Sequence, residues 1–270
     1  ISVVCAVAIA FLYAKTIEPE YSTSAELQIK SDSKGNSFSP ENAFNDMGFF
    51  KSNTNVWNEI IAFSSPDLME EVVERLKLHT DYRKSGLFYD KLLYGTNLPI
   101  VVSMPDLADN ATASFTGTLL GKEKFSISNM TVNGESFDDK KIEGRLHDTI
   151  TTPYGSLIVT PTIHYNIQLI AETNEILVSR TSKQYAVEKY TNRLGVSQNN
   201  KEADVITLSV EDVSPQRAED FLNTLIVVYN EHWIKDKNQI ANSTSIFIND
   251  RLLVIENELA NVDSDISSYK

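Results

Sequence analysis

The chain has only one cysteine, Cys5, in 270 residues. A single thiol cannot form an intramolecular disulfide, and cysteine-based metal sites need more than one such ligand. Histidine is nearly as scarce, and the histidines show neither an HExxH pattern nor a pair at i and i+4. The four histidines are His79, His147, His164 and His232. The sequence therefore predicts no metal site.

Positive charge is also in short supply. The chain holds 24 Lys and Arg against 37 Asp and Glu, which gives a formal net charge of −13 and a pI near 4.8. Proteins that bind nucleic acid neutralise its phosphates with clustered Lys and Arg. The acidic balance therefore argues against nucleic acid as a partner and disfavours docking on anionic lipid.

No catalytic or nucleotide-binding motif is complete. Residues 117–122 (GTLLGK) resemble a phosphate-binding loop, but that loop needs four residues between its glycines and Ser or Thr after the lysine. Here three residues separate the glycines, and Glu123 follows Lys122. No serine lies in a G-x-S-x-G elbow. We therefore predict no catalytic residue and no cofactor, and an extracytoplasmic hydrolase remains as the enzyme alternative.

The chain starts with an uncharged run from Ile1 to Ala14, in which Ser2 is the only polar side chain apart from the Tyr13 hydroxyl. Fourteen residues are fewer than the roughly 20 that span a bilayer. Residues 13–18 offer no convincing small-residue cleavage site, which disfavours the alternative of a signal-peptide core. We expect residues 1–14 to be the outer end of a transmembrane helix. Because Glu18 and Glu20 follow without a Lys/Arg cluster, we expect the rest of the chain to be extracytoplasmic.

The middle of the chain shows two kinds of pattern. Alternation at 21–29 and 204–210 predicts strands, whereas helical spacing at 66–78 and 181–194 predicts helices, the second closed by Gly195. Short alternating runs between 98 and 161, with a turn at Asn133–Gly134, predict further strands. The predicted fold class is α+β: a base of residues 15–97 and 162–213, with an inserted small β module at 98–161.

Residues 214–270 contain no Gly and no Pro after Pro215, and they predict one long helix that enters a coiled coil. Ser214 suits the N-cap and Pro215 the first helical position. In the second half, apolar residues recur in alternating steps of four and three, which is typical of a coiled-coil seam. The predicted seam consists of Ile248, Leu252, Ile255, Leu259, Val262, Ile266 and Tyr269.

Four features, in this order, resemble a known family. They are Pro19–Glu20–Tyr21 with Ala25, Leu27 and Ile29; Ser65–Pro66 through Leu76–Lys77–Leu78; Val205 to Val210 followed by Ser214–Pro215, Ala218, Asn223 and Tyr229; and the coil with Phe247, Arg251, Leu252, Glu258, Leu259 and Tyr269–Lys270. Together they resemble the Wzz-type chain-length determinant family of polysaccharide co-polymerases. The closest likeness is to the extracytoplasmic domain of Wzc-like capsule and exopolysaccharide tyrosine kinases.

The resemblance implies a protein of the bacterial inner membrane whose residues 1–270 are mostly periplasmic. It implies a homo-oligomeric scaffold that regulates the chain length, polymerisation or export of a capsule, exopolysaccharide or O-antigen. Its partners would be the polysaccharide polymerase or export machinery, and the polysaccharide itself. In the kinase members the nucleotide loop belongs to a cytoplasmic region, so the resemblance implies no kinase activity for residues 1–270.

Two other classes share part of the pattern. The extracytoplasmic sensor domain of a membrane receptor would also combine an α+β domain with membrane helices, but it should hold a ligand pocket. A membrane-fusion type secretion subunit would share the coiled coil, but it should flank the coil with lipoyl-like β segments. Here the long helix follows an α+β pattern directly.

Overall fold

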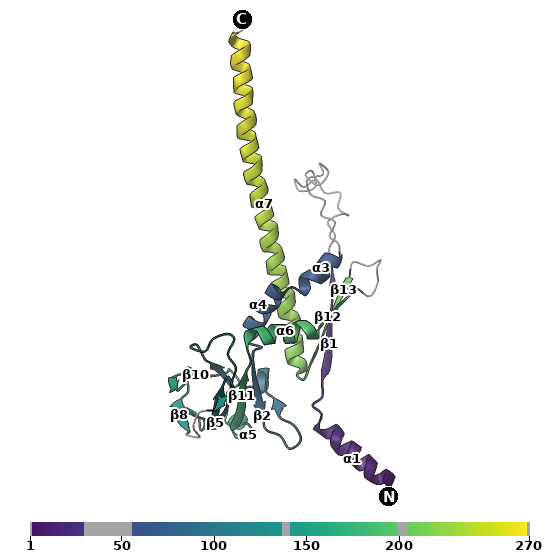
Figure 1. Cartoon of the computed structure of the whole chain (residues 1–270), viewed down its shortest axis with the longest axis vertical. Helices are drawn as coiled ribbons and strands as arrows, with labels where there is room; N and C mark the ends of the chain where they lie inside the picture. The colour runs from purple at the N-terminus through teal and green to yellow at the C-terminus, as the bar shows by residue number, and fades with distance from the viewer. Residues whose placement is uncertain (1, 30–55, 137–140, 199–204, 269–270) are drawn as a thin grey trace. The chain divides into compact units, whose positions relative to one another are not determined.

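The computed structural model describes residues 2–29, 56–136, 141–198 and 205–268. The chain divides into two units, residues 1–225 and residues 226–270. The first unit holds every described strand and all of the shorter helices (Figure 1). The second consists of the greater part of helix α7, which runs from Pro215 to Ser268.

A three-stranded antiparallel sheet joins distant parts of the chain. Strand β13 (Val205–Asp212) lies between β1 (Tyr21–Gln28) and β12 (Leu194–Ser197). Alternate residues of β13 are buried, as a strand with one covered face requires. The strands predicted at 21–29 and 204–210 are therefore confirmed. Gly195 does not close a helix as predicted, because it lies in β12 opposite Ser209.

Helices of the first unit supply a second set of buried side chains. They are α3 (Val56–Phe63), α4 (Pro66–Leu76) and α6 (Lys183–Arg193), together with the first turns of α7. Met69 and Val72 of α4 are fully buried, and the ring of Tyr190 in α6 stacks on Phe221 of α7 with 5.1 Å between centroids. The helices predicted at 66–78 and 181–194 are confirmed.

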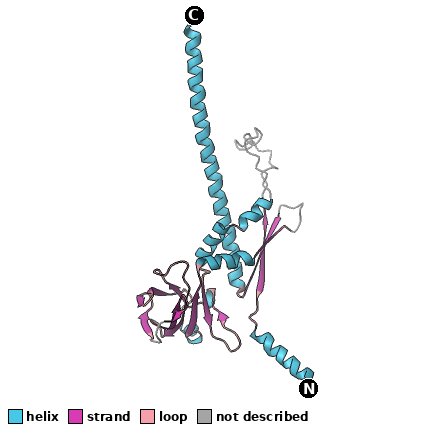
Figure 2. Ribbon diagram, viewed as in Figure 1, coloured by secondary structure: helices cyan, strands magenta, loops and turns pink. Residues whose placement is uncertain are grey.

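A larger antiparallel system makes up the rest of the first unit. One sheet has the order β3-β2-β11-β5-β6-β7 with β8 also on β6, and the other has the order β4-β10-β9. The strands are β2 (Thr80–Lys84), β3 (Lys91–Leu92), β4 (Ile100–Ser103), β5 (Ala113–Leu120), β6 (Lys124–Val132), β7 (Glu135–Ser136), β8 (Ile142–Arg145), β9 (Thr149–Thr152), β10 (Gly155–Pro161) and β11 (Glu175–Arg180). A short helix η2 (Gly95–Asn97) and α5 (Ile167–Glu172) complete the set (Figure 2).

The two sheets share one hydrophobic core. Fully buried side chains come from strands of both: Ile100 and Val159 from the smaller sheet, and Phe125, Ile176 and Val178 from the larger. Asn133 and Gly134 both have positive φ, 51° and 83°, as a two-residue hairpin turn of this kind demands. The predicted turn at this position is confirmed.

The predicted fold class is wrong in two respects. First, the β portion is not a small insertion: β2 and β11, outside the predicted 98–161, join the same sheet as β5 and β6. The protein has mixed α and β structure, with a large antiparallel sheet-rich portion and one long C-terminal helix. Strand β11 leaves little trace in the sequence, because the polar Arg180 faces inward and the apolar Leu177 faces outward.

Second, the prediction of a partial transmembrane helix at residues 1–14 is wrong. Helix α1 (Ser2–Thr16) has 15 residues, a rise of about 22 Å against the roughly 30 Å of a bilayer core. Among the described residues, no helix combines the length and the apolar character that crossing a membrane requires.

Candidate functional site

The start of α7 is fixed by its own capping residues. The Ser214 hydroxyl accepts a hydrogen bond from the Arg217 amide at 3.3 Å, and Pro215 occupies the first helical position. Asp212 Oδ1 accepts a further bond from the Ser214 amide at 2.9 Å. The predicted cap is therefore confirmed, and the helix begins directly after strand β13.

A buried ionic cluster surrounds this cap. Both carboxylate oxygens of Asp212 accept hydrogen bonds from Arg217 Nε at 3.0 Å, and Asp81 Oδ1 accepts one from Arg217 Nη1 at 2.6 Å. The Tyr190 hydroxyl donates to Asp212 Oδ2 at 3.3 Å. Burial alone lowers the pKa of Arg217, but Tyr190, Asp81 and Asp212 raise the pKa more than burial lowers it. The arginine stays charged, and the cluster ties β2, β13, α6 and α7 together.

A polar pocket of about 220 Å³ lies beside β2 and β11. Its floor is Arg180, only 8% exposed, whose Nη atoms donate to the backbone carbonyls of Met104, Leu107 and Ala108. At its rim, Lys183 Nζ lies 2.9 Å from a Glu74 oxygen. The loop that precedes β5 is thereby pinned to the end of β11.

Two buried atoms in this pocket have no hydrogen-bond partner, His79 Nδ1 and Arg180 Nε. Burial lowers the pKa of His79, and the positive charge of Arg180 lowers it further. The histidine is therefore neutral at pH 7. Lys183 pairs with Glu74 and Asp109, and Arg180 donates to backbone carbonyls, so these charges of the pocket serve to hold the surrounding loop.

No described group of three His, Cys, Asp or Glu side chains is arranged to hold a metal ion. The segment that resembles a phosphate loop is a β-hairpin: Gly117 lies in β5, and Gly121 turns the chain into β6 with φ +79°. An added Cβ at Gly117 would lie 2.3 Å from Cζ of Phe125. This glycine makes room for a core ring.

The predicted seam lies in the second unit. Leu252, Ile255 and Leu259 are 51%, 50% and 64% exposed, and Ile248 is less so. Val262 and Ile266 also belong to α7, although only their backbone is described, and Tyr269 lies outside the described residues. The structure thus leaves the side chains of Leu252, Ile255 and Leu259 on the surface of one helix, with Ile248 partly exposed.

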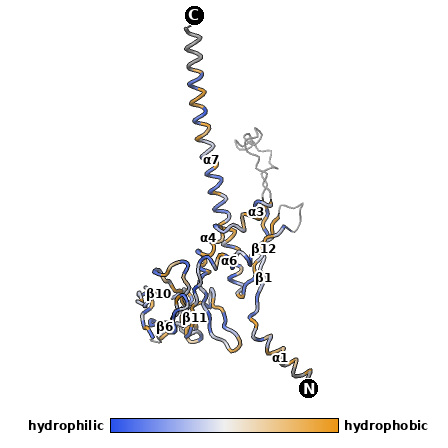
Figure 3. Tube along the Cα trace, viewed as in Figure 1, coloured by the Kyte–Doolittle hydropathy of each residue, from blue (hydrophilic) through white to orange (hydrophobic). Residues whose placement is uncertain are grey.

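Sequence reasoning missed a second apolar surface on the same helix. Ile246, Phe247, Leu253 and Val254 are not seam positions, yet each is exposed. With the seam they place apolar side chains around the helix within residues 246–255, interrupted by the polar Asn249, Asp250 and Arg251, and we call this segment the apolar girdle. Figure 3 shows hydrophobic residues, in orange, in the second half of α7. A helix that is apolar all round normally packs against neighbours on several sides.

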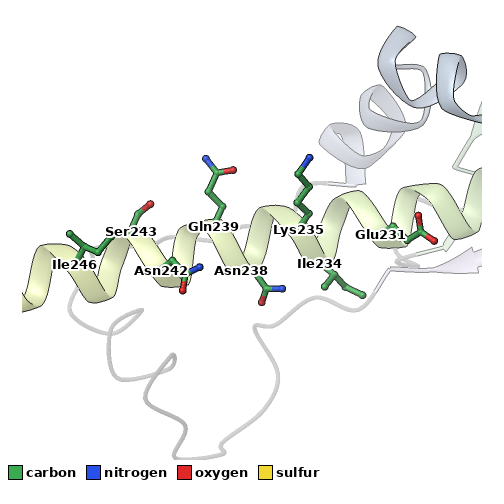
Figure 4. Close-up of a pocket in the computed structure, with 8 residues that line it drawn as sticks. All are labelled: Glu231, Ile234, Lys235, Asn238, Gln239, Asn242, Ser243 and Ile246. Atoms are coloured by element: carbon green, nitrogen blue, oxygen red, sulfur yellow. The ribbon is translucent and has the colours of Figure 1, made fainter.

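The segment before the girdle is polar. Eight residues outline a shallow surface site here, and all of them belong to α7: Glu231, Ile234, Lys235, Asn238, Gln239, Asn242, Ser243 and Ile246. Figure 4 shows Ile234 and Asn238 on one side of the helix and Lys235 and Gln239 on the other. Side chains of a single helix do not enclose a ligand, so this is a helix surface and not a cavity.

Comparison with known proteins adds no assignment. Neither the protein-family models nor the curated proteins contain a match to this chain.

Proposed function

We propose that this chain is a non-catalytic scaffold that associates with copies of itself through the seam of α7. The observation that carries the proposal is the exposed row of Leu252, Ile255 and Leu259 on a helix of 54 residues. Each fully buried aliphatic side chain gains about 1.5–3 kcal/mol relative to an exposed one. A row of such side chains at coiled-coil spacing favours association with other helices.

The order of elements supports a more specific role, that of a chain-length determinant. Residues quoted for that resemblance lie in β1 and β13, which pair along their full length from Tyr21–Asp212 to Gln28–Val205. The same resemblance includes Ser65–Pro66 at the start of α4 and Ser214–Pro215 at the start of α7. The residues near position 21 and those near position 210 that carry the resemblance thus lie in one sheet and in the helix that follows β13.

In this role the protein regulates the length, polymerisation or export of a surface polysaccharide. It acts on the periplasmic side of the bacterial inner membrane, beside the polymerase or export machinery, and the polysaccharide itself is a further partner. The pairing of charges in the Arg180 pocket and around Arg217 supports a structural rather than a catalytic use of these residues.

The seam is tested by the double variant Leu252→Asp and Leu259→Asp. Two carboxylates in the seam should abolish association, because an unpaired charge cannot be buried at acceptable cost. We expect light scattering to give the monomer mass and gel analysis to show an altered polysaccharide length distribution in cells that carry the variant.

A matched control adds two carboxylates on the opposite face of the helix, Asn257→Asp and Ser264→Asp. These positions lie outside the seam, so assembly and polysaccharide length should match those of the unaltered chain. Unchanged assembly in the seam variant would refute self-association through α7. If the seam variant loses assembly but the polysaccharide length distribution is unchanged, self-association stands and only the role in polysaccharide synthesis is refuted.

A further inference from the structure

The heptad of the seam continues towards the start of the second unit. With Leu252 at position a, the a positions are Asn238, Ser245, Leu252, Leu259 and Ile266, and the d positions are Ile234, Ala241, Ile248, Ile255 and Val262. Every d position in this stretch is apolar, whereas the a positions change from polar to apolar after Ser245. The exposed Ile234 marks where the apolar row begins.

We propose that the partner of this surface is a second copy of the same helix, parallel and in register, in a coiled coil of more than two strands. This inference rests on the self-association proposed above and adds its direction, register and minimum size. In register, each position meets its own copy. The amide of Asn238 then meets another amide, and the hydroxyl of Ser245 meets another hydroxyl, so both can hydrogen-bond.

Antiparallel pairing meets an obstacle in the three central arrangements that keep a against d. Centred between Leu253 and Val254, it sets the hydroxyl of Ser245 against Val262. Centred on Asp250, it sets Asn238 against Val262 and Ser245 against Ile255. Burying a polar group without a partner costs more free energy than an exposed ion pair contributes. The attraction of Lys235 and Lys237 for downstream aspartates is therefore too weak to compensate.

Centring the antiparallel pair on Asn257 avoids those polar mismatches but creates others. Glu256 then faces its own copy, and so does Glu258, which places like charges together along both flanks.

Charge complementarity also fits the parallel register. In parallel coils, position g lies beside position e of the next heptad in the neighbouring helix, five residues further on. Arg251 is at g and Glu256 is at e, so each helix offers an arginine to a glutamate of its neighbour. Arg251 is the only basic residue between Lys237 and Lys270. One like-charge contact, Glu258 with Asp263, opposes it.

Two features point to more than two strands. Leucine at a with isoleucine at d, as in Leu252 and Ile255, favours trimers or tetramers over dimers. Ile246 and Leu253 occupy b, and Phe247 and Val254 occupy c, where a two-stranded coil would leave them in water. The apolar girdle is therefore better covered in a larger bundle.

A disulfide tests the direction and register. In a Cys5→Ser background, Ser245→Cys places a thiol at a core a position, beside its own copy only in the parallel register. Mild oxidation should give a covalent dimer in high yield, since bridged Cα atoms must lie within about 7 Å. The matched variant Asn257→Cys, at the outward f position, should remain largely uncrosslinked. An assembled chain that crosslinks at neither position, or equally at both, would overturn the proposed register.

Charge reversal and mass complete the test. Arg251→Glu and Glu256→Arg should each weaken association about two- to fivefold, and the double reversal should restore it. Light scattering should give at least three times the chain mass of 30.3 kDa. A dimer mass, or single reversals without effect, would overturn this inference and leave the proposed scaffold standing. A monomer of the unaltered chain would overturn both.

Discussion

Arg217 illustrates how a single residue fixes the first turn of the longest element. Its guanidinium is 4% exposed and is held by Asp212 and by Asp81, which lies 136 residues earlier in the chain. Removing one partner from a buried pair generally costs about 3–5 kcal/mol, because the remaining charge is left uncompensated. The sequence does not reveal this contact, since nothing around Asp81 distinguishes it from a solvated aspartate.

His79 makes the stability of the first unit depend on pH. Its pKa is lowered from the ordinary 6.5, first by burial and then by Arg180, while Glu74 and Asp109 oppose the shift. A lowered pKa means that the unfolded chain binds more protons, so stability is complete above pH 6.5 and falls as the pH falls through the folded pKa. We expect His79→Gln to lose less stability than the unaltered chain between pH 7.5 and 5.5.

Urea unfolding at the two pH values measures this difference. The two proteins should differ by less than about 1 kcal/mol in how much free energy of unfolding they lose on acidification, because the ring of His79 is only half-buried and solvent screens its neighbours. The exposed His147→Gln removes a histidine elsewhere and should keep the full pH dependence. If His79→Gln and the unaltered chain lose equal stability on acidification, the lowered pKa does not govern this dependence.

At the scale of elements, the β5–β6 hairpin requires a residue without a side chain, Gly117, opposite the ring of Phe125. Phe125 of β6 is fully buried, and its ring occupies the space above Gly117 of β5. Gly117→Ala should destabilise the protein by about 1–3 kcal/mol, the usual cost of overpacking a core. Chemical denaturation of the purified chain measures the loss.

The double variant Gly117→Ala with Phe125→Leu separates overpacking from other effects. A smaller side chain at 125 frees the space that the new methyl group needs, so the double variant should lose less stability than the sum of the single ones. Additive losses would show that the alanine acts through something other than the ring.

Elements with strong local signals could be predicted from the sequence. Strands β1 and β13, helix α4 and the cap of α7 carry clear periodicity, proline or capping residues. Strand β11 could not, because Arg180 is turned inward to bind three loop carbonyls that no local pattern announces. Gly195 was misassigned because a glycine after a helix usually caps it, whereas here the chain enters a strand at once.

The candidate site divides in the same way. The seam follows from spacing alone, because a heptad is a local property of the sequence. The apolar girdle is also a local feature of the sequence, because residues 246–248 and 252–255 form two contiguous apolar runs that extend beyond the seam positions. The pocket around Arg180 joins residues more than 70 positions apart and needed the fold.

At the scale of the whole molecule, an acidic chain with a net charge of −13 carries a helix whose apolar surface is exposed. Residues 226–268 make no sheet of their own, and an isolated helix gains most of its stability from packing. The second unit should therefore be the part whose order depends most on association.

Hydrogen exchange at two chain concentrations, about a hundredfold apart, tests this coupling by mass action. Amides of residues 246–268 should exchange quickly in the dilute sample and become protected in the concentrated one, because copies of α7 then cover the seam. Amides of the buried strand β11, at Ile176 and Val178, should stay protected in both samples, since the core that covers them lies within one chain. Equal protection of residues 246–268 at both concentrations, in a sample of monomer mass, would mean that packing within a single chain stabilises the helix.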